Sequence, residues 1–159
     1  CALTEPGAVE VVSQLQVPVC LMHMQGQPRT MQKDPQYDDV VRDVYNYLSA
    51  RADTCVQGGI KKEQILIDPG FGFGKSVGHN LSLLKHLSAF AQMGLPLLVG
   101  LSRKSMMASI LDKDVNNRLA GSIAAACFAL AGGAVIIRAH DVDETMDAIK
   151  LYTAMSNAD

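Results

Sequence analysis

Polar and charged side chains recur directly after four short apolar runs of this sequence. They are His23 with Gln25, Asp68 with Lys75, the segment Ser102-Arg103-Lys104, and Arg138 with His140 and Asp141. If the four runs are parallel strands of one sheet, their carboxyl ends share one face, where such sheets place binding and catalytic groups. The recurrence therefore predicts one polar site assembled from four separate segments.

The cations in these segments predict a site for an anion. Lys75, Arg103, Lys104 and Arg138 would lie together in a chain whose formal charge is only −2. The helices expected after the strands would add backbone N–H donors and the positive end of the helix dipole. A phosphate or a carboxylate fits such a site. Because His140 follows closely after Arg138, we expect it to contact the same anion.

Asp68 ends an apolar run and precedes Pro69, which favours an extended backbone. Its carboxylate could accept two hydrogen bonds from an amidine-like or aminopyrimidine edge, or it could cap the loop that follows. That loop is rich in glycine and carries Phe73, whose ring could stack on a flat ligand. It matches neither nucleotide motif, because Pro69 replaces the first glycine of a P-loop and Lys75 replaces the third glycine of the dinucleotide fingerprint.

Met22 and His23 are neighbours on the first expected strand and therefore point to opposite faces of the sheet. We expect His23 to be an interior histidine with a hydrogen-bond partner. Met22 either fills the core or forms a wall against an aromatic ligand, since methionine serves both purposes.

The elements that must position these residues alternate between strand and helix. The expected strands are residues 17–24, 64–68, 96–101 and 134–139, and the expected helices are residues 4–15, 37–56, 80–93, 104–111, 116–131 and a last helix through Tyr152. This alternation predicts a parallel sheet covered by helices, in one domain over residues 1–159. The pattern leaves two architectures open, a small doubly wound sheet and half of an eight-stranded barrel.

Composition excludes several classes of protein. Hydrophobic residues make up 48% of the 159 residues and charged residues 19%, which is not the composition of a disordered or fibrous chain. The 14 Lys and Arg residues do not exceed the 16 Asp and Glu residues, so the composition does not indicate a nucleic-acid-binding surface. No apolar run is long enough to cross a membrane. The four cysteines include no C-x-x-C pair, so we expect a reducing, cytoplasmic location. Because the chain begins with Cys, we expect it to be a piece of a longer protein.

Four motifs in this order resemble dihydropteroate synthase. They are LMHMQG at 21–26, DPGFGFGK at 68–75, LLVGLSRKS at 97–105 and R-x-HDV at 138–142. The resemblance implies a TIM (β/α)8 barrel, of which this chain is the C-terminal portion of about four βα units. It also implies the condensation of 6-hydroxymethyl-7,8-dihydropterin pyrophosphate with p-aminobenzoate, giving 7,8-dihydropteroate and pyrophosphate, and inhibition by sulfonamides.

The resemblance implies a pterin pocket in this chain. Asp68 and Lys104 match the pair that hydrogen-bonds the pterin. Met22, Phe73 and Gly100 match residues that shape the pocket around it.

The p-aminobenzoate site is implied in the same way. Phe73 and Lys104 match residues that flank this substrate, and Ser102 and Arg103 match residues near its carboxylate.

The implied catalytic residues are Asp68, Lys104, Arg138 and His140. Arg138 and His140 match the pyrophosphate site, where Mg²⁺ assists departure of the leaving group. In the implied mechanism pyrophosphate leaves first, Asp68 supports the electron-poor ring electrostatically, and the aniline nitrogen then attacks.

Parts of the family's pattern are missing from this chain. The first two strand-end loops, the Asp of the third strand and the Asn of the fourth have no counterpart, so any protein ligand of Mg²⁺ would lie outside these residues and we expect none within them. We therefore expect the isolated 159 residues to be catalytically inactive. Family members are usually homodimers packed through C-terminal barrel helices, which makes a homodimer the expected assembly.

Two other functions are compatible with such a chain. One is a pterin-binding methyltransferase that acts on methyltetrahydrofolate, and the other is a non-catalytic half-barrel that binds pterin or phosphate. The S-R-K-S segment and the R-x-H pair favour the synthase, because a pyrophosphate substrate needs a second anion site.

Overall fold

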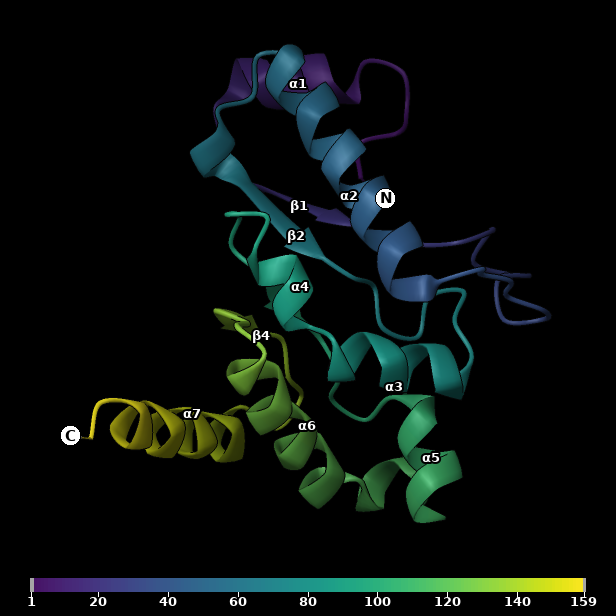
Figure 1. Cartoon of the computed structure of the whole chain (residues 1–159), viewed down its shortest axis with the longest axis vertical. Helices are drawn as coiled ribbons and strands as arrows, with labels where there is room; N and C mark the ends of the chain where they lie inside the picture. The colour runs from purple at the N-terminus through teal and green to yellow at the C-terminus, as the bar shows by residue number, and fades with distance from the viewer. Residues whose placement is uncertain (1, 159) are drawn as a thin grey trace.

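Helices and parallel strands alternate along the chain, as the sequence predicts (Figure 1). The computed structural model describes residues 2–158. The strands are β1 (Val19–Met22), β2 (Ile65–Asp68), β3 (Leu98–Val99) and β4 (Ile136–Ile137). The helices are α1 (Ala8–Leu15), α2 (Val40–Gln57), α3 (Val77–Lys85), α4 (Ser88–Ala91), α5 (Ser105–Leu111), α6 (Leu119–Ala131) and α7 (Val142–Ser156), with 3-10 turns at Lys62–Gln64 and Val115–Asn117.

The four strands lie side by side in chain order. β1 pairs with β2 and β3 pairs with β4, both in parallel, and a parallel bridge between Ile67 and Leu97 joins the two pairs. A doubly wound sheet reverses its strand order at a switch point, whereas a barrel adds each new strand beside the last. The order therefore favours the barrel segment over the doubly wound sheet.

One face of the sheet packs against helices. The residues of this face are fully buried and include Leu21, Ile65, Ile67, Leu97 and Val99. Helix α2 lies against β1 and β2 with the apolar stripe that its sequence predicts, which consists of Val40, Val44, Leu48, Ala52 and Cys55. Burial of this stripe is the physical reason that an 18-residue amphipathic helix forms at this place.

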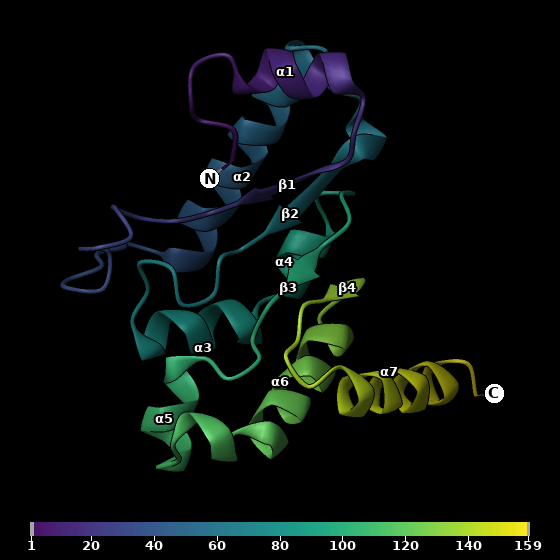
Figure 2. The same ribbon diagram turned by 180° about the vertical axis from the view of Figure 1, so that it is seen from behind.

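The opposite face is open within the described residues 2–158. The register places Cys20 beside Leu66, and Leu98 beside Ile136, with these side chains on the face away from α2. Cys20 is exposed, and Ile136 retains 38% of its exposure. Seen from behind, β1 and β2 lie in front of α2 (Figure 2). An apolar row of this kind is the inner face of a barrel whose other strands would cover it.

Several expected boundaries are wrong: the helices expected from residues 37 and 116 begin at Val40 and Leu119, and the strands expected at 96–101 and 134–139 are limited to Leu98–Val99 and Ile136–Ile137. Two further helix boundaries are wrong for a reason that the structure shows. The helix expected from residue 4 begins at Ala8, because Gly7 at φ 79° occupies the N-cap position. The helix expected at 80–93 is divided into α3 and α4, because the chain turns at His86 and Leu87. The turn brings Leu87 into the core with no exposed surface, which compensates for the interrupted helix.

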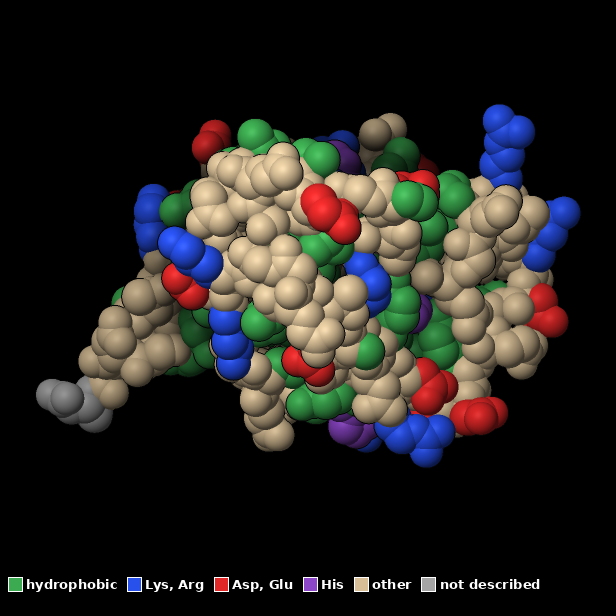
Figure 3. All heavy atoms as spheres, turned by 90° about the horizontal axis from the view of Figure 1, so that it is seen from above, with side chains coloured by type: hydrophobic (Ala, Val, Ile, Leu, Met, Phe, Trp, Pro, Cys, Tyr) green, Lys and Arg blue, Asp and Glu red, His purple; other side chains and the backbone are tan. Residues whose placement is uncertain are grey.

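The surface carries both signs of charge. Lys and Arg side chains are interspersed with Asp and Glu on the face seen from above α1, without a large patch of one sign (Figure 3). Of the helices in residues 2–158, none combines the length and the apolar character that crossing a membrane requires.

Candidate active site

Neighbouring strands place Met22 and Asp68 on the open face, with Gly100 and Arg138 two residues further toward the carboxyl ends of their strands. Met22 lies opposite Asp68 in the register, and Arg138 N donates to Val99 O at 2.9 Å, which places Arg138 beside Gly100. Gly100 has no side chain, and a Cβ added there would lie 3.1 Å from Arg138 Nε. The missing side chain therefore makes the space that the Arg138 guanidinium occupies.

Asp68 is a loop cap and a buried carboxylate at the same time. Its Oδ1 accepts a hydrogen bond from Gly70 N at 2.7 Å, and the residue is 8% exposed. Burial raises the pKa of Asp68, while the Gly70 N–H and the charges of Lys104 and Arg138 act to lower it. The two interpretations of Asp68 are thus compatible, because one oxygen caps the loop while the cations on the open face surround the carboxylate.

Lys104 and Phe73 lie next to each other on this face. Lys104 Nζ is 4.4 Å from the centroid of the Phe73 ring, a cation–π contact. Burial lowers the pKa of Lys104, and the charge of Arg138 lowers it further, while Asp68 opposes both effects. A flat aromatic ligand and an acceptor for Lys104 could therefore bind at the same place.

Ser102 contacts His140. The hydroxyl oxygen of Ser102 lies 3.0 Å from His140 Nδ1 and accepts a hydrogen bond from His140 N at 3.2 Å. Both residues come from strand-end loops, one after β3 and the other after β4. Because Nδ1 is engaged by the hydroxyl, the ring orientation is set and Nε2 is left for another partner.

Arg103 is held by protein groups. Its guanidinium forms an ion pair with Asp141, in which Nε donates to Oδ2 at 3.2 Å and Nη2 donates to Oδ1. The Arg103 hydrogen bond lowers the pKa of Asp141. The backbone of Arg103, at φ 57°, donates to Ser122 Oγ at 3.0 Å and accepts from Arg118 Nη1 at 3.1 Å. The loop after β3 is thus tied to the loop after β4 and to α6.

The expectation that Lys75 belongs to the cation rim is wrong. Lys75 is 3% exposed, and its ammonium group lies beneath the glycine-rich loop, 2.9 Å from His23 Nδ1. Burial lowers the pKa of Lys75 to about 7. His23 is the interior histidine that the sequence predicts, at 6% exposure. Burial also lowers the pKa of His23 to about 4, and the charge of Lys75 contributes to that shift.

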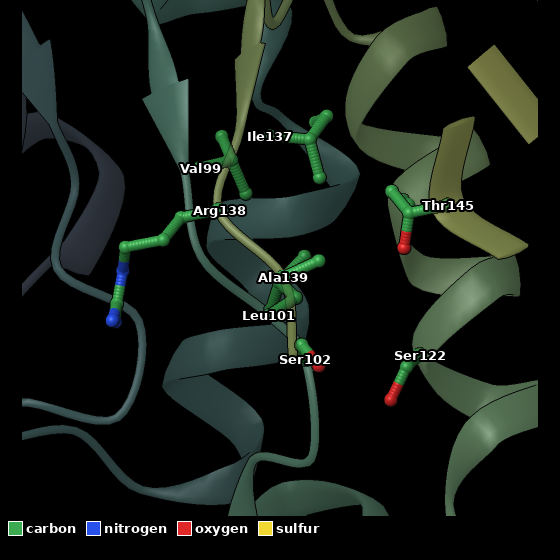
Figure 4. A pocket seen from close by; sticks show the side chains of 9 residues that line it. Val99, Leu101, Ser102, Ser122, Ile137, Arg138, Ala139 and Thr145 are labelled. Carbon is green, nitrogen blue, oxygen red and sulfur yellow. The ribbon is translucent and has the colours of Figure 1, made fainter. Parts of the chain in front are cut away.

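Behind β3 and β4, the side of the sheet that faces α6 and α7 has no room for a ligand. Between β3, β4, α6 and α7 a cavity of about 10 Å³ remains, lined in part by Ser122 and Thr145. This is space for one water molecule at most. Arg138 points away from Ser122 and Thr145, to the other side of the strands (Figure 4). A ligand of these strand ends would therefore bind on the open face.

Sequence reasoning missed several supporting residues. Asn80 on α3 accepts from Gly72 N at 2.8 Å and donates to Ser76 O at 2.7 Å, and the Tyr37 hydroxyl donates to Gly74 O at 2.8 Å. Arg118 and Ser122 hold the loop after β3, as described above. These residues belong to no motif, and several of their partners are far away in sequence, so no local pattern could have identified them.

The described residues do not fit a Mg²⁺ site. In residues 2–158 no group of three or more His, Cys, Asp and Glu side chains is placed to hold a metal ion. Asp68, the carboxylate of this face, is buried and lies in the field of Lys104, Arg138 and Lys75. A carboxylate already facing three cations is a poor ligand for a divalent cation.

A parallel barrel segment with a buried carboxylate and cations at its strand ends is the setting of a particular enzyme family. The family model for pterin binding enzymes matches residues 2–140. The chain belongs to this family of pterin-binding enzymes.

Three similar proteins are dihydropteroate synthases. The Haemophilus influenzae protein is 54% identical over 157 residues, which are 99% of this chain and 57% of that protein. The Yersinia pestis enzyme in complex with a sulfonamide drug has a TM-score of 0.95 and 48% identity, covering 99% of this chain and 57% of the other. The Xanthomonas albilineans enzyme in complex with 7,8-dihydropteroate has a TM-score of 0.92 and 42% identity, covering 99% of this chain and 58% of the other. The chain thus has the fold of part of the dihydropteroate synthase barrel and spans somewhat more than half the length of these relatives.

Proposed function

We propose that the protein carrying this chain is a dihydropteroate synthase, a transferase of folate biosynthesis. It would condense 6-hydroxymethyl-7,8-dihydropterin pyrophosphate with p-aminobenzoate and release pyrophosphate. The observation that carries the proposal is the placement of Asp68, Lys104, Arg138 and His140 at the carboxyl ends of parallel strands, with Asp68 and Arg138 on the open face of the sheet. Residues 1–159 would be the C-terminal part of a single barrel domain.

The pterin would bind beside Asp68 and Lys104. A buried carboxylate is a strong acceptor for the amino and ring N–H groups of an aminopyrimidine, and Lys104 supplies a donor for its carbonyl oxygen. Met22 and Phe73 would form apolar walls, and the absence of a side chain at Gly100 lets the Arg138 guanidinium lie close to the sheet, beside the ring.

The second substrate and the leaving group would bind on either side of the pterin. Phe73 and Lys104 offer a surface for the p-aminobenzoate ring, with Ser102 and Arg103 on the side of its carboxylate. Arg138 and His140 would hold the pyrophosphate. A sulfonamide resembles p-aminobenzoate in its aniline ring, so it would compete at the same place.

The reaction would proceed by departure of pyrophosphate. The bond from the pterin methylene carbon to the pyrophosphate oxygen breaks, and the oxygen keeps the electron pair next to Arg138 and His140. The positive charge that develops on the methylene and the pterin ring is stabilised by the nearby Asp68 carboxylate. The lone pair of the aniline nitrogen then forms the new C–N bond, and this nitrogen loses a proton.

A second copy of the chain is the proposed partner of α6 and α7. An open groove of about 900 Å³ between these helices is almost entirely apolar. Phe128 and Met155 are each 63% exposed there, and Leu151 is 74% exposed. An apolar patch of this kind is typical of an interface that is covered in the assembled protein. Two copies of the groove facing each other would form a homodimer. We place this protein in the cytoplasm, where Cys20, Cys55 and Cys127 would stay as the free thiols that the structure contains.

The proposed function is tested by supplying both substrates to the purified protein. We expect formation of 7,8-dihydropteroate, measured by mass spectrometry, together with an equal amount of pyrophosphate. Asp68→Asn should lower kcat/KM about 100-fold because it removes a charge that stabilises the transition state. Asp112→Asn, on an exposed residue, is the matched control.

Two outcomes would contradict the proposal. One is the absence of dihydropteroate, and the other is transfer of a methyl group from methyltetrahydrofolate to a corrinoid protein in place of condensation. The 159 residues alone should form no product, because the covering half of the barrel is not among them.

A further inference from the structure

Lys75 and His23 form a buried polar pair directly beneath the glycine-rich loop. Lys75 Nζ lies 2.9 Å from His23 Nδ1, donates to Gly70 O at 2.9 Å and donates to Phe73 O at 3.1 Å. The three hydrogens of an ammonium group match these three acceptors. A lysine that is 3% exposed cannot reach a ligand on the open face, so its effect on that face must pass through the groups that it holds.

The groups held by this pair belong to the two sides of the proposed substrate pocket. Gly70 N donates to the carboxylate of Asp68, and His23 N donates to Asp68 O at 3.0 Å. Phe73, the proposed wall for both substrates, is held by its carbonyl oxygen and by a hydrogen bond from Phe73 N to Gly70 O at 3.1 Å. The ammonium group of Lys75 therefore contacts both parts from the buried side.

The loop lies on the backbone of the segment after β1 with no spare space. A Cβ added to Gly70 would be 1.9 Å from His23 O, and one added to Gly74 would be 2.3 Å from Gln25 O. Both glycines have positive φ, 71° and 64°. Side chains at Gly70 and Gly74 would therefore push the loop away from the segment after β1, and Lys75 and His23 join these two segments on the buried side.

We propose that Lys75 and His23 are positioning residues that hold Asp68 and Phe73 in register and thereby set the affinity for both substrates. The proposal rests on the proposed function and extends it to two buried residues. Arg138 and His140 come from other strand ends and make no contact with the pair that the structure records. The proposal therefore separates two parts of the site, because the pyrophosphate contacts should not depend on Lys75.

The test is Lys75→Met in the protein that carries this chain, because this change removes the ammonium group and its three hydrogen bonds while keeping an unbranched side chain. We expect the KM of both substrates to rise about 10-fold, since a displacement of about 1 Å in a binding site has effects of this size or larger. The inhibition constant of pyrophosphate should change less than about 2-fold, because its site is held by other loops. Lys85→Met, on an exposed residue of α3, is the matched control and should behave as the unsubstituted protein.

A pair of variants at His23 checks the same inference without touching the lysine. His23→Asn keeps an oxygen acceptor near the place of Nδ1, and His23→Leu removes it. We expect the KM values of both substrates to stay within about 3-fold in His23→Asn. In His23→Leu we expect them to rise as in Lys75→Met. These two variants decide the question if Lys75→Met does not fold.

The inference is overturned if folded Lys75→Met has unchanged KM values. It is also overturned if every parameter, including the pyrophosphate constant, worsens in parallel, because the residue would then have a general structural role. If the unsubstituted protein forms no dihydropteroate, the proposed function fails by itself. Hydrogen exchange of the Gly70 and Phe73 amides then tests the positioning role, with faster exchange expected in Lys75→Met and unchanged exchange refuting it.

Discussion

Gly70→Ala should destabilise this protein far more than a glycine substitution at a similar backbone angle elsewhere. Gly70 has φ 71° and Gly7 has φ 79°, so an alanine at either place lowers the free energy of unfolding by about 1 to 2 kcal/mol because of the left-handed conformation. The surroundings differ completely. A Cβ at Gly7 has no atom within 4 Å, whereas a Cβ at Gly70 would lie 1.9 Å from the backbone oxygen of His23.

The magnitude follows from this distance. Ordinary contact begins near 3.4 Å, so the loop and the strand end must separate by about 1.5 Å. The atom that blocks the way is backbone and cannot turn aside. Forced repacking of this kind costs about 1 to 3 kcal/mol, and the hydrogen bonds of Lys75 to the loop would weaken in addition. We therefore expect a loss of about 3 to 5 kcal/mol for Gly70→Ala and about 1 to 2 kcal/mol for Gly7→Ala.

Urea unfolding of the two variants beside the unsubstituted protein measures the difference, with the m-value checked for each. Gly70→Ala should also raise the KM of p-aminobenzoate, because Phe73 moves with the loop. Equal destabilisation of the two variants, within about 0.5 kcal/mol, would refute the reasoning from the close contact.

Three further predictions concern other parts of the molecule. Burial lowers the pKa of His23 to about 4 in the folded protein, against an ordinary value of 6.5. Between these pH values the unfolded chain binds more protons than the folded protein. The free energy of unfolding should therefore fall by about 3 kcal/mol as the pH drops from 6.5 to 4. Urea unfolding at the two pH values measures this loss, and a His23→Asn variant that loses as much stability would contradict it. Ser102→Ala should weaken pyrophosphate binding about 5-fold, because it removes the hydrogen bond at His140 Nδ1, which contributes about 1 kcal/mol. Calorimetry measures the affinity, and an unchanged value would exclude this role of Ser102. Phe128→Asp should convert the proposed dimer to a monomer, as measured by sedimentation, whereas the control Val11→Asp on the exposed face of α1 should leave the dimer intact. A dimer that persists in Phe128→Asp would place the interface elsewhere.

The order of the elements was predictable because it rests on local patterns. Strands of apolar residues followed by helices indicate a parallel sheet wherever they occur, and the polar residues after each strand could be assigned to one edge without coordinates. The stripe of α2, from Val40 to Cys55, was visible as a period of three to four residues and is buried as expected. The choice between barrel segment and doubly wound sheet was not local, because it depends on which strands are neighbours.

The errors concern residues whose environment is set by distant segments. Lys75 and Lys104 both follow apolar strands and look alike in sequence, yet one is buried against His23 and the other faces Phe73 on the open side. Arg103, which we propose to lie on the side of the p-aminobenzoate carboxylate, has a partner that its local sequence does not identify, because its guanidinium is paired with Asp141 at the end of the next strand. Nothing near a cation in sequence tells which acceptor it will meet after folding.

The amino-acid sequence by itself determined the family, the parallel alternation and the four segments that form the site. These features follow from composition, periodicity and motifs, which act over a few residues and do not require a folded chain. The tertiary structure alone decided which cations face the open side of the sheet, which one lies beneath the loop, and which hydroxyl orients His140. Those outcomes depend on burial and on partners 38 to 52 residues away, because the cost of an unpaired buried charge is settled only when the whole chain has packed.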